Sequence, residues 1–469
     1  MRSRRAGVVM VALVVAATIG SLVGSTGSAG AASRPGSGSA SGTGAGADGP
    51  TYRESMRAAI ADIQDFWARE YRALYGRGYE PIPQARVIAA RPGVTIPKCQ
   101  GFKVSYRDVR GNAFYCLESN FIAYDDVGLM PQFFETFGQF APSLILAHEW
   151  GHAIQDRADV EQLGLPSVYV ELQADCFAGA WTGDVAVKPQ QVAYAPGDLE
   201  GAVAALIELR DAPGSSPDDS DAHGSAFDRL SAFQDGYLLG PERCAAYVDE
   251  PPLVVQIPFS SRAEAASGGN LPAEDVIPTT VELLDEFYSR VEPEFRSLTL
   301  ADVVAFDSTR VRTIPRCGGT RPDVEVVANR VYFCIEDGYL AFDEPFLQSV
   351  YDEIGDFGVA TLIANPVATS VQIGQRIPGA RDNTLEAVMQ ADCYTGGWVA
   401  ALYNGFLSGS LSAGDLDEFV QAYLSYSRAR GVSGDVPLTF VRVRFFRQGF
   451  LEGYGSCDYA RIAAQVAAL

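Results

Sequence analysis

The chain has 469 residues, with 36 Lys and Arg against 58 Asp and Glu, and a formal charge of −22 at pH 7. Because phosphate contacts need clustered positive charge, this balance argues against a nucleic-acid-binding protein. Apolar residues make up 47% of the chain and charged residues 20%, so most of it can bury globular cores. The length indicates two or three domains.

The N-terminal segment 1–31 has the three-part layout of a secretory signal peptide. Basic residues precede an apolar run from Ala6 to Val23, and small residues follow at 29–31. The sequence therefore predicts a secreted or cell-surface protein. An uncleaved membrane tether is the alternative, because a run of about 18 apolar residues is near the lower limit for spanning a bilayer. Residues 32–50, rich in Gly and Ser, are typical of a flexible linker.

The eight cysteines indicate an internal repeat. Their separations are 17, 60 and 68 residues in the first four and 17, 59 and 64 in the last four. The segment 173–181 recurs as 390–398, with QADCFAGAW matched by QADCYTGGW at an offset of 217. We interpret the chain as two tandem modules, 51–250 and 278–469, joined by a connector rich in Pro, Ser and Gly at 251–277.

Each module opens with a predicted amphipathic helix. Apolar residues recur at helical spacing at Met56, Ile60, Ile63, Trp67, Tyr71 and Leu74, and again at Leu283, Phe287 and Val291. We expect these side chains to pack in the cores.

Even cysteine numbers in an exported chain favour disulfides over metal or catalytic thiols. Four cysteines allow three pairings, and sequence alone does not choose among them. In the first module, Cys99 and Cys116 flank two short extended segments and a turn-like DVRGN at 108–112, which suggests a β-hairpin closed at its base. On this spacing we predict the same pattern in both modules, with Cys99 bonded to Cys116, Cys176 to Cys244, Cys317 to Cys334 and Cys393 to Cys457.

The motif His148-Glu149-Trp150-Gly151-His152 follows an apolar run at 144–147. Residues four apart lie on the same face of a helix, so both imidazoles can reach one ion. A catalytic zinc usually takes three protein ligands. Downstream, Glu171 and Asp175 are also four apart, so one carboxylate could bind the metal while the other accepts the free ring N–H of a ligating histidine.

Together with ELQADCFAG at 171–179 and the later His223-Gly224-Ser225 and Arg229, this motif resembles a bacterial family described as putative neutral zinc metallopeptidases. The resemblance covers most of the first module. It implies an α+β, mainly helical, zincin-like fold. It also implies one Zn²⁺ per chain held by His148, His152 and Glu171, with Asp175 behind a ligating histidine.

The expected activity is hydrolysis of a peptide or protein substrate. Glu149 is the predicted general base, which takes a proton from a zinc-activated water and delivers it to the leaving amine. His223 suits a donor to the developing oxyanion, or alternatively a structural histidine near the cap of the following helix.

The second module lacks the site. At an offset of 217, His148 maps to Asn365, Glu149 to Pro366, His152 to Thr369 and Glu171 to Val388, whereas Asp175 maps to Asp392. An offset of 213 places Val436 opposite His223. Pro366 should also disturb the helix interior. We therefore predict a degenerate, non-catalytic second copy. The alternative for the whole chain is a non-catalytic secreted or surface binding protein, built from two disulfide-bonded modules that resemble a peptidase.

Overall fold

The structure is a computed structural model that describes residues 50–426 and 438–468. The predicted signal segment 1–31, the linker up to residue 49 and Val436 lie outside the described residues. We call residues 51–250 the first half and residues 273–468 the second half. The first half contains α1 (Tyr52–Tyr75), β1 (Val87–Ala90), α2 (Tyr106–Val109), β2 (Ala113–Cys116), β3 (Phe121–Asp125), α3 (Leu129–Phe137), α4 (Ala141–Arg157), α5 (Ser167–Val187), α6 (Pro196–Glu208), α7 (Ala226–Leu239) and α8 (Pro241–Ala245).

The short helix α9 (Arg262–Ser267) lies in the connector. The second half contains, from its first helix, α10 (Ala273–Val291), β4 (Val303–Phe306), α11 (Val324–Val327), β5 (Val331–Cys334), β6 (Tyr339–Asp343), α12 (Glu344–Glu353), α13 (Asp356–Gly374), α14 (Leu385–Tyr403), α15 (Asp415–Tyr426), α16 (Leu438–Glu452) and α17 (Tyr459–Val466). Short 3₁₀ helices are η1 (Gln84–Arg86), η2 (Val160–Leu163), η3 (Ala246–Val248), η4 (Leu300–Asp302), η5 (Val311–Thr313) and η7 (Tyr454–Ser456). The fold is thus α+β and mainly helical.

The opening helices form where the apolar spacing predicts them. Thr51 and Glu54 make a capping box at the start of α1, and Gly76 ends the helix with a positive φ of 68°. The apolar face of α1, including Trp67, is buried. In the second half, α10 begins at Ala273, so the predicted boundary at 278 falls inside this helix.

Each half carries one small sheet with the same pairing. In the first half, β3 lies in the centre, parallel to β1 and antiparallel to β2. In the second half, β6 lies in the centre, parallel to β4 and antiparallel to β5. In both sheets the two outer strands precede the central strand in sequence.

The predicted hairpin inside the Cys99 to Cys116 segment is wrong. The antiparallel partner of β2 is β3, which follows it, and the segment before β2 forms the short helix α2. The reason is local, because Ser105 and Asp108 make a capping box that starts a helical turn where an extended strand was expected.

Four disulfides join the pairs that the cysteine spacing predicts. Cys99 is bonded to Cys116 and Cys176 to Cys244 in the first half. The second half contains the corresponding bonds, Cys317 to Cys334 and Cys393 to Cys457. Among the described residues no disulfide joins the two halves, and none of the cysteines is free. Since stable disulfides form in oxidising compartments, the chain has the character of an extracytoplasmic protein.

The helices α5 and α7 approach so closely that glycine is required at the contact. A Cβ built on Gly179 would lie 2.0 Å from the carbonyl oxygen of Phe233, and one on Gly236 would lie 1.8 Å from that of Cys176. The equivalent pair in the second half, α14 and α16, makes the same contact through Gly396 and Gly449. This close packing fixes α7 against the helix that carries Glu171.

The expected disturbance at Pro366 is also wrong. Helix α13 continues through this residue, which is buried inside it. The packing of α13 against α10, α14 and α15 offsets the backbone hydrogen bond that proline cannot donate. Helix α13 is long and apolar enough to cross a membrane by composition, but 72% of its most apolar window is buried inside the protein, as in a core helix.

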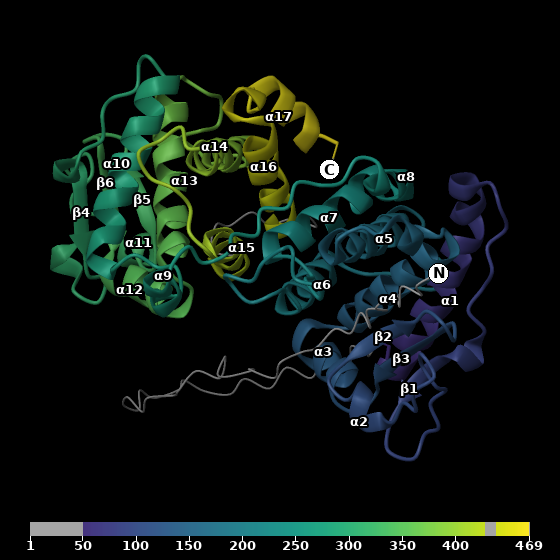
Figure 1. Ribbon diagram of the computed structural model, residues 1–469. Helices are drawn as coiled ribbons and strands as arrows, with labels where there is room; N and C mark the ends of the chain where they lie inside the picture. The colour runs from purple at the N-terminus through teal and green to yellow at the C-terminus, as the bar shows by residue number, and fades with distance from the viewer. Residues whose placement is uncertain (1–49, 427–437, 469) are drawn as a thin grey trace, which may run out of the picture.

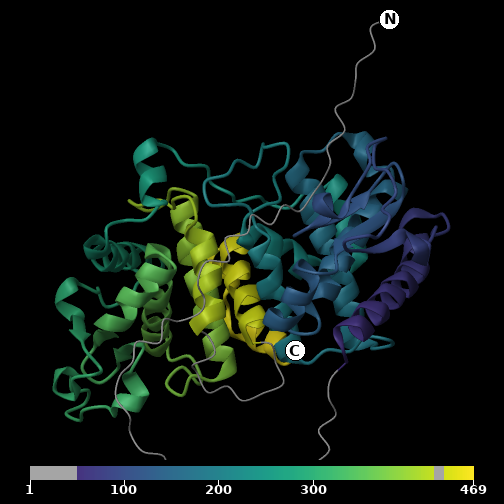
Figure 2. The ribbon, with the colours of Figure 1, turned by 90° about the horizontal axis from the view of Figure 1, so that it is seen from below.

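The two halves pack against each other through α7. Figure 1 shows the second half, green to yellow, beside the purple-to-teal first half, with α15 and α16 next to α6 and α7. Figure 2 shows the same junction from below, with the yellow helices against the teal ones. Phe227 contacts Phe446 and Phe450, and Phe440 contacts Phe233 across the junction. Helix α7 therefore belongs to the cores of both halves.

Candidate metal centre

Helix α4 presents the two histidines on one face. Pro142 lies in its first turn, where proline costs no hydrogen bond, and residues 141–155 are buried. His148 and His152 are one turn apart, with ring centroids 4.8 Å from each other. Their Nε2 atoms face each other at 3.2 Å. The helical spacing thus brings both imidazoles to one point, as the motif predicts.

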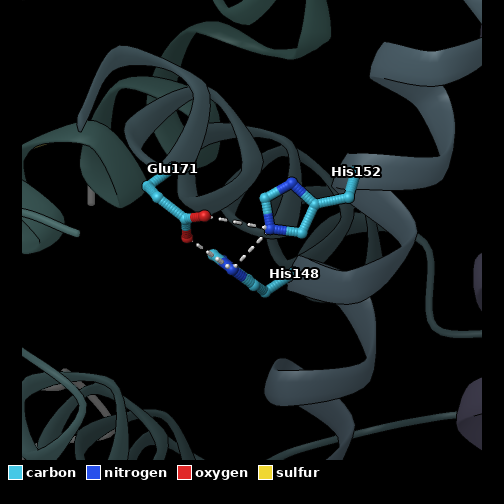
Figure 3. A group of neighbouring side chains, drawn as sticks. All are labelled: His148, His152 and Glu171. Atoms are coloured by element: carbon cyan, nitrogen blue, oxygen red, sulfur yellow. Dashed lines mark hydrogen bonds and ion pairs between the residues drawn. The ribbon is translucent and has the colours of Figure 1, made fainter. Parts of the chain in front are cut away.

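Glu171 on α5 completes the group. One carboxylate oxygen lies 3.2 Å from His148 Nε2 and the other lies 3.5 Å from His152 Nε2. Figure 3 shows the two rings extending from one helix toward the carboxylate of the helix that faces it. Each of the three side chains offers one potential ligand atom, and these atoms all lie within 4.8 Å of one another. All three are buried.

Bonding around Glu171 fits a cation. Both carboxylate oxygens are buried and accept no hydrogen bond from any residue that the structure describes, although the histidines lie within ion-pair distance. Leaving a buried carboxylate without donors is costly unless a positive charge is close. Two imidazole nitrogens and one carboxylate are a usual catalytic zinc set. The donor set therefore suits Zn²⁺.

Asp175 orients His148 and is itself held by Arg229. The His148 Nδ1 atom lies 2.7 Å from Asp175 Oδ1, so its N–H donates to the carboxylate and leaves Nε2 toward the metal position. Arg229 donates to both oxygens of Asp175 at 2.8 Å and to the Leu209 carbonyl at 2.6 Å. Of the two carboxylates that the sequence offers as ligands, Glu171 lies in the metal group and Asp175 lies behind it.

Gln155 plays the same part for His152, and sequence reasoning missed it. Its Oε1 lies 2.9 Å from His152 Nδ1, while its amide donates to the Val170 carbonyl and to Gln173. The signal was present in the repeat, because Gln155 recurs as Gln372 at the offset of 217. In the structure Gln372 keeps the corresponding bonds to Ala387 and Gln390. Both histidine rings thus have a fixed tautomer and orientation.

The charges of the site shift several pKa values. Burial lowers the pKa of His148, but Asp175 and Glu171 outweigh burial and raise it to about 10. Burial raises the pKa of Glu171, but the nearby histidines hold it well below its usual range. Burial also raises the pKa of Glu149, although His148 and His152 oppose this. The net effect is a pKa of Glu149 above its usual range.

His223 lies in the loop before α7, and its electrostatic interaction with Glu171 contributes to the lowered pKa of that carboxylate. Its Nδ1 lies 3.3 Å from Asp211 Oδ1, and its backbone N–H donates to Asp211 Oδ2 at 2.8 Å. Its Nε2 is buried and has no hydrogen-bond partner in the described part of the chain. The N-cap of α7 is Ser225, so His223 does not cap this helix.

The second half keeps the supporting network without the ligands. Asn365 donates to Asp392 at 2.8 Å, where His148 meets Asp175 in the first half. Arg442 donates to both oxygens of Asp392, and Tyr423 donates to one. All three histidines of the chain are in the first half. In the described residues of the second half, the one potential ligand group contains disulfide-bonded cysteines.

Comparison with known proteins agrees with this geometry. The family described as "Putative neutral zinc metallopeptidase" matches residues 2–247, just over half of the chain. The uncharacterized protein YpfJ of Escherichia coli K12 is 29% identical over 213 residues, which cover 40% of this chain and 69% of YpfJ. The uncharacterized protein Rv2575 of Mycobacterium tuberculosis is 31% identical over 160 residues, 29% of this chain and 54% of that protein. No solved structure matches. The chain therefore belongs to the putative neutral zinc metallopeptidase family.

Proposed function

We propose that the protein is an exported zinc-dependent peptidase whose active site lies in the first half. The observation that carries the proposal is the convergence of His148, His152 and Glu171, with both Glu171 oxygens buried and without a hydrogen-bond donor. Membership of a putative zinc metallopeptidase family and the donor set both support zinc as the metal. Zinc bound there polarises a substrate carbonyl and lets water act as a nucleophile at neutral pH.

Glu149 is the proposed general base. As the water oxygen bonds to the carbonyl carbon of the substrate, Glu149 takes one water proton. When the C–N bond breaks, Glu149 delivers this proton to the leaving nitrogen, so the carboxylate is regenerated and no covalent enzyme intermediate forms. His223, whose buried Nε2 lacks a protein partner, is the proposed donor to the carbonyl oxygen as negative charge develops.

We also propose that the halves are a duplication and that the second copy is not catalytic. The sheets have the same strand order and the disulfides correspond. In each half the Asp of the Gln-Ala-Asp-Cys motif forms a buried ion pair with an Arg. Asn365 and Thr369 stand where the first half has its histidines. Residues 1–31 are the proposed export signal, with a membrane tether as the alternative, and a peptide or protein is the proposed substrate.

The test is the zinc content of the purified protein, with peptide hydrolysis measured on the same samples. We expect a single zinc per chain in the wild type, none in His148→Ala, and full zinc in Asn365→Ala, the matched change in the second half. Glu149→Ala should retain zinc and lose hydrolysis. Wild-type protein that holds no zinc after loading, or hydrolysis that persists in Glu149→Ala, would overturn the proposal. The first of these results would favour the non-catalytic binding protein.

A further inference from the structure

We infer that the second half is part of the active site's support, because Asp417 on α15 positions the loop that carries His223. The expected effect on hydrolysis rests on the proposed function, whereas the expected effect on the position of His223 does not. Asp417 is buried at the junction of the halves. Its Oδ1 accepts the backbone N–H of Ala226 at 2.8 Å and that of Phe227 at 3.4 Å.

These two N–H groups are in the first turn of α7, where helices leave backbone donors without internal partners. Ser225 caps the same end from within the first half by accepting from Asp228. The first turn of α7 is therefore held from two sides, by its own N-cap and by a carboxylate of the second half. Two residues before Ser225 is His223, so the position of this turn sets the path of the His223 loop.

Asp417 also holds the other side of that loop. Its Oδ2 lies 3.4 Å from Nε of Arg210. Arg210 is the middle of three consecutive residues with separate tasks. The carbonyl of Leu209 accepts from Arg229, the guanidinium of Arg210 pairs with the second half, and Asp211 binds His223.

The three tasks converge because residues 209–211 form one short backbone segment. Asp211 binds both backbone N–H groups at 223 and 224, and its own N–H donates to the Gly224 carbonyl. A shift of Arg210 therefore moves Asp211 and, with it, the His223 ring. A small surface pocket of about 20 Å³ is lined by this segment, the connector and α15. The packing gives the segment little freedom to relax, so Asp417 is a positioning residue that acts through Arg210 and α7.

The chain offers a matched control. Arg447 on α16 pairs with Asp235 near the other end of α7, also across the junction and with similar burial. Removing either pair weakens the contact between the halves, but only the pair at Arg210 adjoins the His223 loop. Arg447→Ala therefore reports the cost of a weaker junction, and Asp417→Ala reports this cost together with any effect on His223.

The experiment uses the full chain, loaded with zinc and labelled with ¹³C,¹⁵N-histidine. The chain has only three histidines, so its ring spectrum holds three sets of signals, and the set of His223 is the one lost in His223→Gln. We expect Asp417→Ala to shift and broaden the His223 signals, and Arg447→Ala to leave them unchanged. The kcat/KM for peptide hydrolysis should fall at least about tenfold in Asp417→Ala at unchanged zinc content, because a misplacement of about 1 Å can cost about 10²-fold.

Unchanged His223 signals in Asp417→Ala would overturn the inference. If that variant does not fold, Asp417→Asn and Arg210→Gln replace it. The asparagine keeps an acceptor for the Ala226 N–H, the glutamine removes the ion pair from the opposite side, and both should move the His223 signals in the same direction. Absence of wild-type hydrolysis would refute the proposed function and leave the spectral test intact.

Discussion

Substitution of Arg229, which forms a buried ion pair with Asp175, tests separately how this pair affects protein stability and zinc affinity. Arg229 is fully buried and makes two charge-assisted hydrogen bonds to Asp175 and one to Leu209. At about 1.5–3 kcal/mol for each charge-assisted bond, its removal costs about 3–6 kcal/mol. This agrees with the 3–5 kcal/mol typical of breaking a buried ion pair. We therefore expect Arg229→Met to lower the free energy of unfolding by about 4 kcal/mol.

The matched variant is Arg442→Met. Arg442 binds both oxygens of Asp392 at 2.7 and 2.6 Å in the second half, so its loss should destabilise the protein by a similar amount. Only Arg229 supports the carboxylate that orients His148, a proposed zinc ligand. Losing such support typically weakens metal affinity by about 10–100-fold. We expect this loss in Arg229→Met and wild-type affinity in Arg442→Met.

The assays are urea unfolding and competition for zinc with a chromophoric chelator. Both variants should show a lower unfolding midpoint, and they should differ in zinc affinity. Equal zinc affinity in the two variants would refute the reasoning, because Asp175 would then hold the fold together without tuning His148. A loss of affinity in both would mean that the second half contributes to zinc binding through a route other than Asp417.

The other predictions concern pH and packing. Burial and the charges of Asp356 and Asp415 raise the pKa of Glu418 to about 9. Glu418 therefore stays protonated in the folded chain at pH values where the unfolded chain has already released this proton. Its contribution to the free energy of unfolding is complete below about pH 4 and is lost as pH rises through about 9. Glu418→Gln should lose less stability than wild type between about pH 5 and pH 9 in urea unfolding, and equal losses would contradict this. Gly179→Ala should lower the free energy of unfolding by at least about 3 kcal/mol, because its Cβ would meet a backbone carbonyl. Gly197→Ala, where the added Cβ would meet no atom within 4 Å, should unfold thermally like the wild type.

The metal group was predictable because it depends mostly on spacing along two helices. Residues four apart share a face in any α-helix, so His148 and His152 could be paired without knowing the fold. The role of Glu171 came from a resemblance, since sequence spacing treats it and Asp175 alike. Only the structure shows that the Asp175 carboxylate is bound by Arg229, so Glu171 is the carboxylate of the candidate metal group.

The errors and omissions have local or long-range causes. The wrong hairpin came from extending a strand through Ser105, where a capping box favours a helical turn. The continuity of α13 through Pro366 depends on neighbouring helices, which a local proline rule ignores. The contact of Asp417 with Ala226 joins residues 191 positions apart, so no local pattern signals it.

The closed network around Asp392 gives the two halves different requirements for assembly. Asn365, Tyr423 and Arg442 satisfy this carboxylate with protein groups alone, so the second half can complete its core with no ion. The first half has a buried Glu171 that protein donors leave unsatisfied. Because α7 packs against both halves, the second half can hold this helix in place without an ion. With the proposed zinc site, we therefore expect zinc to stabilise the first half and to leave the folding of the second half unchanged.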